Sequence, residues 1–400
     1  MAAPARSSYR RTPPFGRREI HHRKLRLGFG LLQKARRDDA LRRAGAVEEF
    51  DAVYFGAVGA PDVPDHITLW GLRPQICQGF DQYANVRPTK ILPGITPPLR
   101  NCGVGDLDWV IVRENSEGEY SGNGGRAHRG LPEEVGTEVA IFTRVGVTRI
   151  MRYAFKLAQA RPRKLLTVVT KSNAQRHGMV MWDEIAAEVA EEFPDVTWDK
   201  MLVDAMTVRM TLRPQSLDTI VATNLHADIL SDLAGALAGS IGVAPTANID
   251  PQRRFPSMFE PIHGSAFDLT GKGIANPVAT WTAAQMLEHL GEQAAAAHLM
   301  RAVETVTGAG ILTRMSAGRP LPRMSLTPSA TRSTPPNGGT TMTWDDRKAR
   351  AALHRIFDVA IASPVQPSIV PRHLDKYLSF IVLKSPLVKA RMPLTSLFQL

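Results

Sequence analysis

Between residues 50 and 240, the chain alternates short apolar runs with longer amphipathic stretches. The runs at 53–55, 107–115 (LDWVIVREN) and 164–173 (KLLTVVTKSN) predict buried strands, and residues 217–235 (LDTIVATNLHADILSDLAG) predict a fourth strand followed by a helix. Helices are also predicted by the periodicity of two stretches, 144–162 and 179–194. Strands that alternate with helices indicate an α/β fold, in which ligands bind beyond the carboxyl ends of the strands.

Polar side chains gather at the predicted strand ends. They are Arg113, Glu114, Asn115, Lys171, Ser172, Asn173, Asn224 and Asp228. The chain has no internal repeat of fixed period and no GxGxxG fingerprint, because the glycines of residues 56–61 (GAVGAP) have the wrong spacing. A dinucleotide site in this chain would therefore be built differently from that of a Rossmann domain.

Asp228 and Asp232 lie four residues apart in the predicted helix. Residues at i and i+4 are neighbours on one helix face, so two negative charges there repel each other unless a cation or water solvates them. Hard cations such as Mg²⁺ or Mn²⁺ prefer oxygen ligands, and Asp204, just after another short apolar run, could supply a third carboxylate. The alternative is that Asp228 caps the helix and Asp232 faces solvent.

Arg87 and Arg113 lie among apolar residues, and an arginine can bind a carboxylate with two parallel hydrogen bonds. A structural salt bridge is the alternative for each. Lys171 is a candidate base with a lowered pKa, and Tyr120 is a candidate proton donor. Either one alone would be an ordinary surface or core residue, but their common place near strand ends favours an active site.

Residues 258–277 (MFEPIHGSAFDLTGKGIANP) have few core-forming positions, and several glycines and prolines lie near small polar residues. Such a loop lets backbone N–H groups approach a phosphate. Asp268, five positions after His263, could accept hydrogen bonds from ribose hydroxyls and would repel a 2′-phosphate. The segment therefore predicts a dinucleotide site, and a long structural turn is the alternative.

Composition restricts the functional classes. With 44% hydrophobic and 22% charged residues, the 400-residue chain resembles an ordinary globular protein long enough for two domains. The chain contains no apolar run of about eighteen residues, so no membrane span is predicted. The two cysteines, Cys77 and Cys102, fit a reducing cytosol, and the first thirty residues lack the apolar core of a secretory signal. We therefore expect a cytoplasmic protein.

The net charge of +11 would suggest an acidic partner such as nucleic acid, but it is unevenly placed. Residues 1–45 carry +10 and residues 314–400 carry +9, whereas residues 46–313 carry −8. The acidic centre argues against nucleic-acid binding. Both ends lack sustained periodicity and predict disordered tails, with an Arg-rich, acid-poor transit peptide as the alternative for the first.

Four segments resemble the metal-dependent β-decarboxylating dehydrogenases, the family of isopropylmalate, isocitrate, D-malate and tartrate dehydrogenases. HADILSD and EPIHGSAFD with GKGIANP are similar to family-wide motifs, whereas VRENSEGEYSGNGGRAHRG and DHITLWGLRPQICQGFDQYANVRP are most similar to the tartrate branch. The resemblance covers residues 48–313. It implies a two-domain, non-Rossmann α/β fold with its active site in the interdomain cleft. The implied reaction is metal-dependent, NAD-linked oxidation, with decarboxylation, of tartrate or D-malate.

The resemblance also implies a division of the chain and a homodimer with shared sites. Residues 48–85 and 240–313 would form a discontinuous cofactor-binding domain, and residues 86–239 would form the substrate, metal and dimerisation domain. Residues 1–47 and 314–400 would be aberrant basic tails, which we expect to be disordered. We expect no nucleic-acid or membrane partner.

Site residues carried over from the family have distinct roles. The ligands of Mn²⁺ or Mg²⁺ would be Asp228, Asp232 and the partner subunit's Asp204. Arg87, Arg113 and Asn173 would bind the substrate, the partner subunit's Lys171 would take the proton of the C2 hydroxyl, and Tyr120 would protonate the enol left by decarboxylation. The family binds NAD through one loop. In this chain the residues of that loop that would bind NAD are His263, Gly264, Ser265, Ala266, Asp268 and Asn276. The resemblance allows a monovalent cation such as K⁺ as a further ligand.

The chain departs from the family pattern in three places. Cys77 stands where many members carry a further arginine, and Arg73, one turn earlier, could partly replace it. Residues 1–47 lack the family's GDGIG-type turn. After residues 310–313 (GILT), the family continues as PDVGGT, whereas this chain reads RMSAGR at 314–319, as one deleted nucleotide would produce. We therefore expect both ends to be translated out of frame, with GDGIG and PDVGGT in the other frames of the gene.

Two other functions stay open. Isopropylmalate-type or isocitrate oxidation is the alternative within the family, although Cys77 and the WGL segment argue against both. The other is a catalytically impaired relic, because a missing strand and cofactor segment would leave backbone groups unpaired and apolar surface exposed.

Overall fold

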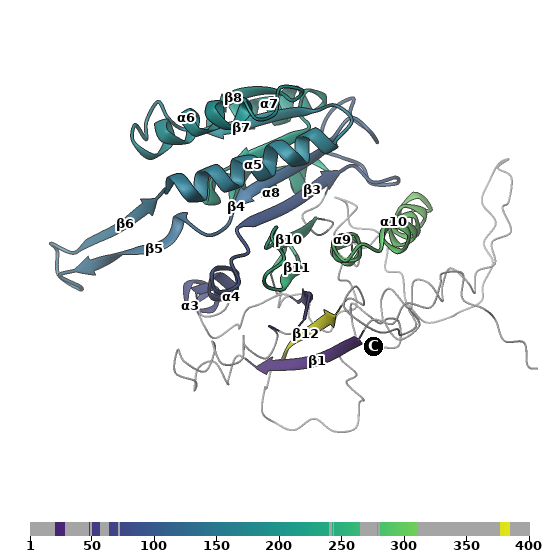
Figure 1. Cartoon of the computed structure of the whole chain (residues 1–400), viewed down its shortest axis with the longest axis horizontal. Coiled ribbons are helices and arrows are strands. Elements are labelled where there is room, and N and C mark those ends of the chain that lie inside the picture. Colours follow the sequence, from purple (N-terminus) through teal and green to yellow (C-terminus); the bar gives the residue numbers. More distant parts are fainter. Residues whose placement is uncertain are drawn as a thin grey trace, which may run out of the picture.

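One mixed ten-stranded sheet forms the centre of the molecule (Figure 1). The computed structural model describes residues 50–56, 64–70, 73–239, 244–264 and 281–310, the single residues 48, 242 and 278, and the strands 21–28 and 377–384. The strand order is β1-β12-β2-β11-β10-β3-β4-β9-β7-β8. Its strands are β1 (His21–Gly28), β2 (Ala52–Phe55), β3 (Ala84–Lys90), β4 (Asp108–Glu114), β7 (Leu165–Thr170), β8 (Thr197–Leu202), β9 (Thr219–Ala222), β10 (Pro245–Ile249), β11 (Ser257–Pro261) and β12 (Tyr377–Lys384).

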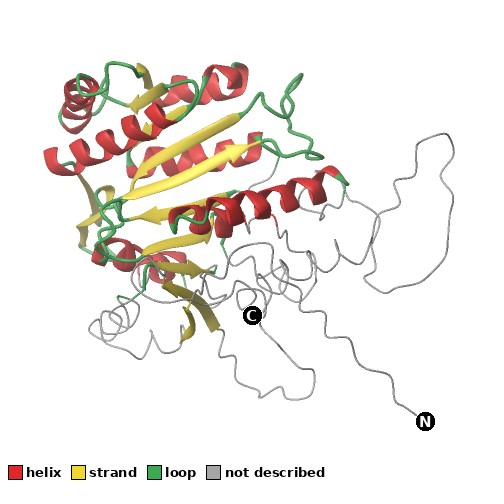
Figure 2. Cartoon of the chain, turned by 45° about the vertical axis from the view of Figure 1, so that its right-hand side comes forward, coloured by secondary structure: helices red, strands yellow, loops and turns green. Residues whose placement is uncertain are grey.

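Helices cover both faces of the β4-β9-β7 part of the sheet (Figure 2). Alternate side chains of β4 enter different cores, because successive residues of a strand point to opposite faces. Val112 joins a core with α5 and α6, whereas Trp109 and Ile111 join a core with α7 and α8. Burial on both faces explains why this strand reads as a continuous apolar run. The bounds are α5 (Arg144–Ala160), α6 (Gly178–Ala190), α7 (Val203–Leu212) and α8 (Asn224–Leu237).

Three smaller groups of elements complete the described structure. α3 (Asp65–Trp70) and α4 (Arg73–Gly79) precede β3, and η1 (Pro214–Ser216) precedes β9. α9 (Trp281–His289) packs on β10 and β11 and is followed by α10 (Gln293–Gly308). β5 (Gly118–Ala127) and β6 (Val135–Ile141) pair as a separate two-stranded arm that extends away from the sheet (Figure 1).

The strands and helices predicted from the periodicity are all present, and the α/β fold class is confirmed. Strand β3 (ANVRPTK) was not predicted, because three of its seven residues are Asn, Arg and Lys and its apolar positions do not form a run. It is nevertheless central in the sheet, antiparallel to both β4 and β10. The division into two domains stays a prediction.

The expectation of disordered tails was wrong for two segments. Strand β12 has the sequence YLSFIVLK, rich in β-branched and aromatic residues, and it pairs antiparallel with β2 and β1. The edge of β2 that faces away from β11 is therefore hydrogen-bonded to β12. The remainder of both tails, including the proposed change of frame at 313–319, lies outside the described residues.

Among the residues that the structure describes, no helix is long and apolar enough to cross a membrane.

Candidate active site

Three of the predicted site residues converge on the carboxylate of a fourth, Asp228. Asp228, on α8, forms an ion pair with Arg113 of β4 and lies 3.5 Å from Nη2 of Arg87 of β3. The hydroxyl of Tyr120, on β5, donates a hydrogen bond to Oδ2 of the same aspartate across 3.4 Å. Elements far apart in the sequence thus bring two cations, a phenol and a carboxylate into contact.

The segment before Tyr120 is fixed to two helix N-termini. The carboxylate of Glu117 accepts hydrogen bonds from the backbone N–H (2.9 Å) and hydroxyl (2.7 Å) of Thr143, the N-cap of α5. Glu119 accepts from the Thr223 hydroxyl (3.0 Å) and from the Leu225 N–H (3.1 Å) at the start of α8. Carboxylates are favoured at helix N-termini, because unpaired N–H groups and the helix dipole lie there. Gly118, between the two glutamates, has φ +73°, a conformation that favours glycine.

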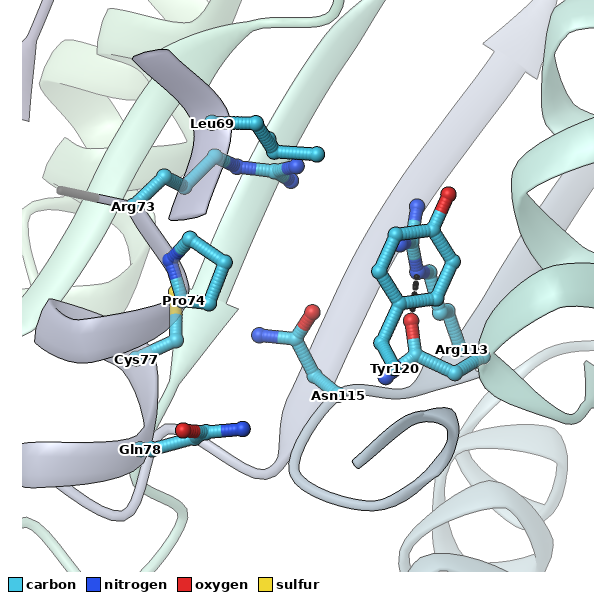
Figure 3. A pocket seen from close by; sticks show the side chains of 9 residues that line it. Leu69, Arg73, Pro74, Cys77, Gln78, Arg113, Asn115 and Tyr120 are labelled. Carbon is cyan, nitrogen blue, oxygen red and sulfur yellow. Dashed lines mark hydrogen bonds between the residues drawn. The ribbon is translucent and has the colours of Figure 1, made fainter. Parts of the chain in front are cut away.

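The ring of Tyr120 is held by two neighbours, Trp70 and Arg113, of which Figure 3 shows Arg113. The ring of Trp70 stacks with it at 6.3 Å between centroids, and the guanidinium of Arg113 lies 5.1 Å from its centroid. Burial and the negative charge of Asp228 raise the pKa of Tyr120 above its ordinary value. The phenol is therefore protonated at neutral pH, as a proton donor must be.

The two arginines are almost fully buried, each with 3% of its surface exposed. Burial lowers the pKa of both groups, and for Arg87 the nearby charge of Arg113 lowers it further. The negative charge of Asp228 compensates the positive charges of the two arginines. Burial acts to raise the pKa of Asp228, but the arginines outweigh it and hold that pKa below its ordinary value. Each arginine thus forms a salt bridge, which was the alternative to substrate binding. Its partner, Asp228, is however itself a residue of the predicted site.

Asp228 does not cap its helix. The N-cap of α8 is Thr223, whose hydroxyl accepts from the His226 N–H, so this part of the alternative reading is wrong. Asp232 lies one turn after Asp228 and is exposed. Its pKa is raised by partial desolvation and by the charge of Asp228. Two neighbouring carboxylates with this mutual repulsion are a donor set suited to a hard divalent cation.

The third predicted metal ligand lies elsewhere. Asp204, at the start of α7, is exposed and accepts a 2.6 Å hydrogen bond from the ammonium group of Lys171, which follows β7. This bond lowers the pKa of Asp204. Asn173, two residues after the lysine, is also exposed. No group of three metal-binding side chains occurs among the described residues. Within one chain, Asp228 and Asp232 therefore form one group of site residues, and Asp204 and Lys171 form another.

The predicted cofactor residues are placed only in part. His263 and Gly264 follow β11, and Nδ1 of the histidine lies 3.0 Å from the carbonyl oxygen of the glycine. The other four, Ser265, Ala266, Asp268 and Asn276, lie outside the described residues.

A pocket adjoins Tyr120 and Arg113 (Figure 3). Arg73 and Cys77 of α4 line it, and Nε of Arg73 also donates to Glu260 across 2.6 Å. Burial raises the pKa of the Cys77 thiol to about 11, so it stays protonated at neutral pH. The remaining lining residues are Leu69, Pro74, Gln78, Asn115 and Asn224.

Sequence reasoning missed four residues at this site: Trp70, Ser231, Asn248 and Glu260. Ser231 accepts from Nη1 of Arg87 at 2.5 Å. Asn248 and Glu260 each follow an apolar residue in a short strand, but this pattern became significant only once their partners from other strands were known.

Comparison with known proteins identifies the family. The profile of the isocitrate/isopropylmalate dehydrogenase family matches residues 17–321, which is more of the N-terminal segment than the motifs suggested. The chain belongs to this family. It is therefore an oxidoreductase that acts on CH–OH groups.

Individual relatives in this dehydrogenase family agree. The chain is 91% identical over 268 residues to a probable tartrate dehydrogenase/decarboxylase of Agrobacterium vitis, covering 67% of this chain and 75% of the relative. It is 51% identical over 271 residues to a decarboxylating D-malate dehydrogenase of Escherichia coli, covering 66% and 75%. The structure is similar to that of an isocitrate dehydrogenase from Methylococcus capsulatus, with a TM-score of 0.63, 36% identity, and coverage of 73% and 83%.

Proposed function

We propose that this dehydrogenase oxidises a small 2-hydroxy dicarboxylic acid, D-malate or tartrate, at C2 and releases the carboxyl group beyond C3 as CO₂. The observation that carries the proposal is the convergence of Arg87, Arg113 and Tyr120 on Asp228. Two buried cations suit a substrate with two carboxylates. The high identity to proteins named for tartrate and D-malate supports this choice over a substrate with an alkyl group.

The residues of the chain have separate tasks in this reaction. Arg87 and Arg113 bind the carboxylates and exclude water from their side of the substrate. The partner subunit's Lys171 accepts the proton of the C2 hydroxyl as hydride leaves C2. After CO₂ is lost, the enol of the product must gain a proton at C3, and Tyr120 supplies it, because its raised pKa keeps it protonated.

Asp228 and Asp232 would bind Mn²⁺ or Mg²⁺, together with the partner subunit's Asp204. The fit rests on the donor set, because two adjacent carboxylates are present and the raised pKa of Asp232 reports their repulsion. When bound, a divalent cation supplies positive charge that stabilises the enolate formed as CO₂ leaves. Within the described part of one chain, only two of the proposed acidic ligands come together, which supports a homodimer with shared sites.

NAD is the proposed hydride acceptor. The segment after β11 begins with His263 and Gly264 and, by its composition, would bind the dinucleotide phosphates through backbone N–H groups. Asp268 in this segment would favour NAD over NADP, because a carboxylate repels a 2′-phosphate.

NADH formation by the purified full chain tests the proposal. Absorbance at 340 nm is followed with D-malate or tartrate, with and without Mn²⁺, and with Asp228→Asn as the blank. We expect activity that requires both Mn²⁺ and Asp228. Faster turnover of isopropylmalate or isocitrate would contradict the substrate class. A folded dimer that oxidises none of the four acids would instead support the alternative of an impaired relic.

A further inference from the structure

Polar side chains replace apolar ones in the middle of the sheet, beside the candidate site. Asn85, Asn248 and Glu260, on β3, β10 and β11, have 0%, 0% and 6% of their surface exposed. Burying such groups costs free energy unless each finds hydrogen-bond partners, and apolar residues would serve stability at least as well. A buried polar cluster next to a pocket therefore suggests a role in positioning.

Asn248 is the centre of this cluster. Its side-chain oxygen accepts hydrogen bonds from the amides of Asn85 (2.6 Å) and Asn115 (3.1 Å). Its side-chain nitrogen donates to Oε1 of Glu260 at 2.9 Å and lies 3.5 Å from the carbonyl oxygen of Met258. One amide thus uses its acceptor and its donor toward different strands.

Each branch of the cluster ends at an arginine. On one side, Oδ1 of Asn85 accepts from Nε of Arg87 at 2.8 Å. On the other side, Oε1 of Glu260 accepts from Nε of Arg73 at 2.6 Å. Arg73 comes from α4 and lines the same pocket as Asn115 (Figure 3). A continuous chain of hydrogen bonds therefore runs from one guanidinium to the other through Asn248.

We propose that Asn248 is a positioning residue that fixes Arg73 relative to Arg87, so that Arg73 joins Arg87 and Arg113 in holding the carboxylates of the substrate. The proposal rests on the proposed function of the site and deepens it. In both arginines, Nε is used by the cluster, so the guanidinium cannot rotate freely. Preorganised donors bind an anion more tightly, because less freedom is lost on binding.

The substitution Asn248→Asp separates the two branches. It keeps the oxygen that accepts from Asn85 and Asn115, and it replaces the donor toward Glu260 by an oxygen. At high pH, two ionised carboxylates would repel each other and disturb Arg73. At low pH, one shared proton restores a donor between them. The defect should therefore depend on pH, which a merely structural role would not produce.

The measurement is KM for D-malate in the Mn²⁺-loaded full chain, expressed as the ratio of variant to wild type. For Asn248→Asp we expect a ratio of about ten at pH 8.5 and of less than about two at pH 6. The KM for NAD and kcat per folded enzyme should change less than about twofold. Asn248→Leu, which removes both branches, should raise KM equally at both pH values. Asn123→Asp, at an exposed position of β5, is the matched control, with a ratio of one.

A pH-independent ratio for Asn248→Asp, or a lower kcat with unchanged KM, would overturn the proposal. If Asn248→Leu does not fold, the nearly isosteric Asn248→Asp carries the test alone. If the wild type oxidises only tartrate, KM is measured for tartrate instead. If it oxidises neither acid, the proposed function fails, and calorimetric titration of D-malate into the Mn²⁺-loaded wild type and Asn248→Asp replaces the assay. The same pH-dependent ratio of Kd values supports the proposal, whereas equal values or no binding to the wild type overturn it.

Discussion

The phenol of Tyr120 and the carboxylate of Asp228 share a hydrogen bond of 3.4 Å, although 108 positions separate them in the sequence. The aspartate is itself held by two buried arginines. Tyr120 is thus aimed at the point where charges converge, rather than at bulk solvent. A proton donor needs this placement, because it must reach the reacting carbon within hydrogen-bond distance.

Replacing Tyr120 by Phe should remove the proton donor and keep the aromatic packing on Trp70. We expect kcat for pyruvate formation from D-malate to fall by about a hundredfold or more. The affinity for D-malate should change little, because the two arginines remain. Stopped-flow assays of NADH and pyruvate would check this. Tyr153→Phe, a partly buried tyrosine of α5, is the control, and equal effects of the two changes would contradict the assigned role.

Asp228→Asn should destabilise the metal-free protein at neutral pH. Burial opposes the ionised carboxylate, but the arginines lower its pKa, so its ionised form stabilises the fold above the ordinary value of 3.8. That contribution is lost as pH falls through the lowered pKa. Because the side chain is 35% exposed, we expect a loss of only about 1–2 kcal/mol at pH 7. Calorimetry in the presence of a chelator should show the difference vanish in acid.

Asp232→Asn should act with the opposite sign. Desolvation and the charge of Asp228 raise the pKa of Asp232, so its ionised form disfavours the folded state. The unfavourable contribution appears as pH rises above 3.8. Without metal, Asp232→Asn should therefore raise the melting temperature at pH 7 and leave it unchanged below the ordinary pKa. A lower melting temperature at pH 7 would show that the two carboxylates do not repel each other.

Glu119→Ala should disturb both α8 and Tyr120. Two hydrogen bonds at the start of the helix would be lost, at a cost of about 1–2 kcal/mol in stability. We expect kcat to fall about tenfold as Tyr120 shifts from Asp228. Glu119→Gln retains groups that can bond Thr223 and should recover most of the activity. Glu138→Ala, on exposed strand β6, is the control, and an effect as large as that of Glu119→Ala would count against the interpretation.

Mixing two inactive variants should test the shared sites. Lys171 and Asp228 belong to separate groups in one chain, so the proposed dimer joins Lys171 of one subunit to Asp228 of the other. Lys171→Met and Asp228→Asn, unfolded together and refolded, should regain about one quarter of wild-type activity, because half of the dimers are mixed and each has one intact site. Each variant refolded alone is the control. No recovery in a demonstrably mixed dimer would contradict shared sites.

The sequence predicted what depends on local pattern or motif. The apolar runs located β4, β7 and β9, because these strands are buried on both faces. It did not reveal Asn248, since a polar residue in a short strand becomes significant only when partners from β3 and β11 are known. Trp70 was part of a recognised segment, but its contact with Tyr120 depends on tertiary packing.

The two glutamates on either side of Gly118 have a consequence for how the chain tolerates insertions and deletions. Glu117 reaches the N-terminus of α5 and Glu119 that of α8, so the spacing of these residues matches the gap between two helices. An added or deleted residue at 117–119 would release one helix and shift Tyr120 along its strand. The turn at 128–134, at the end of the arm, has no such constraint. Length differences among relatives should therefore occur at the arm tip and be absent from residues 117–119.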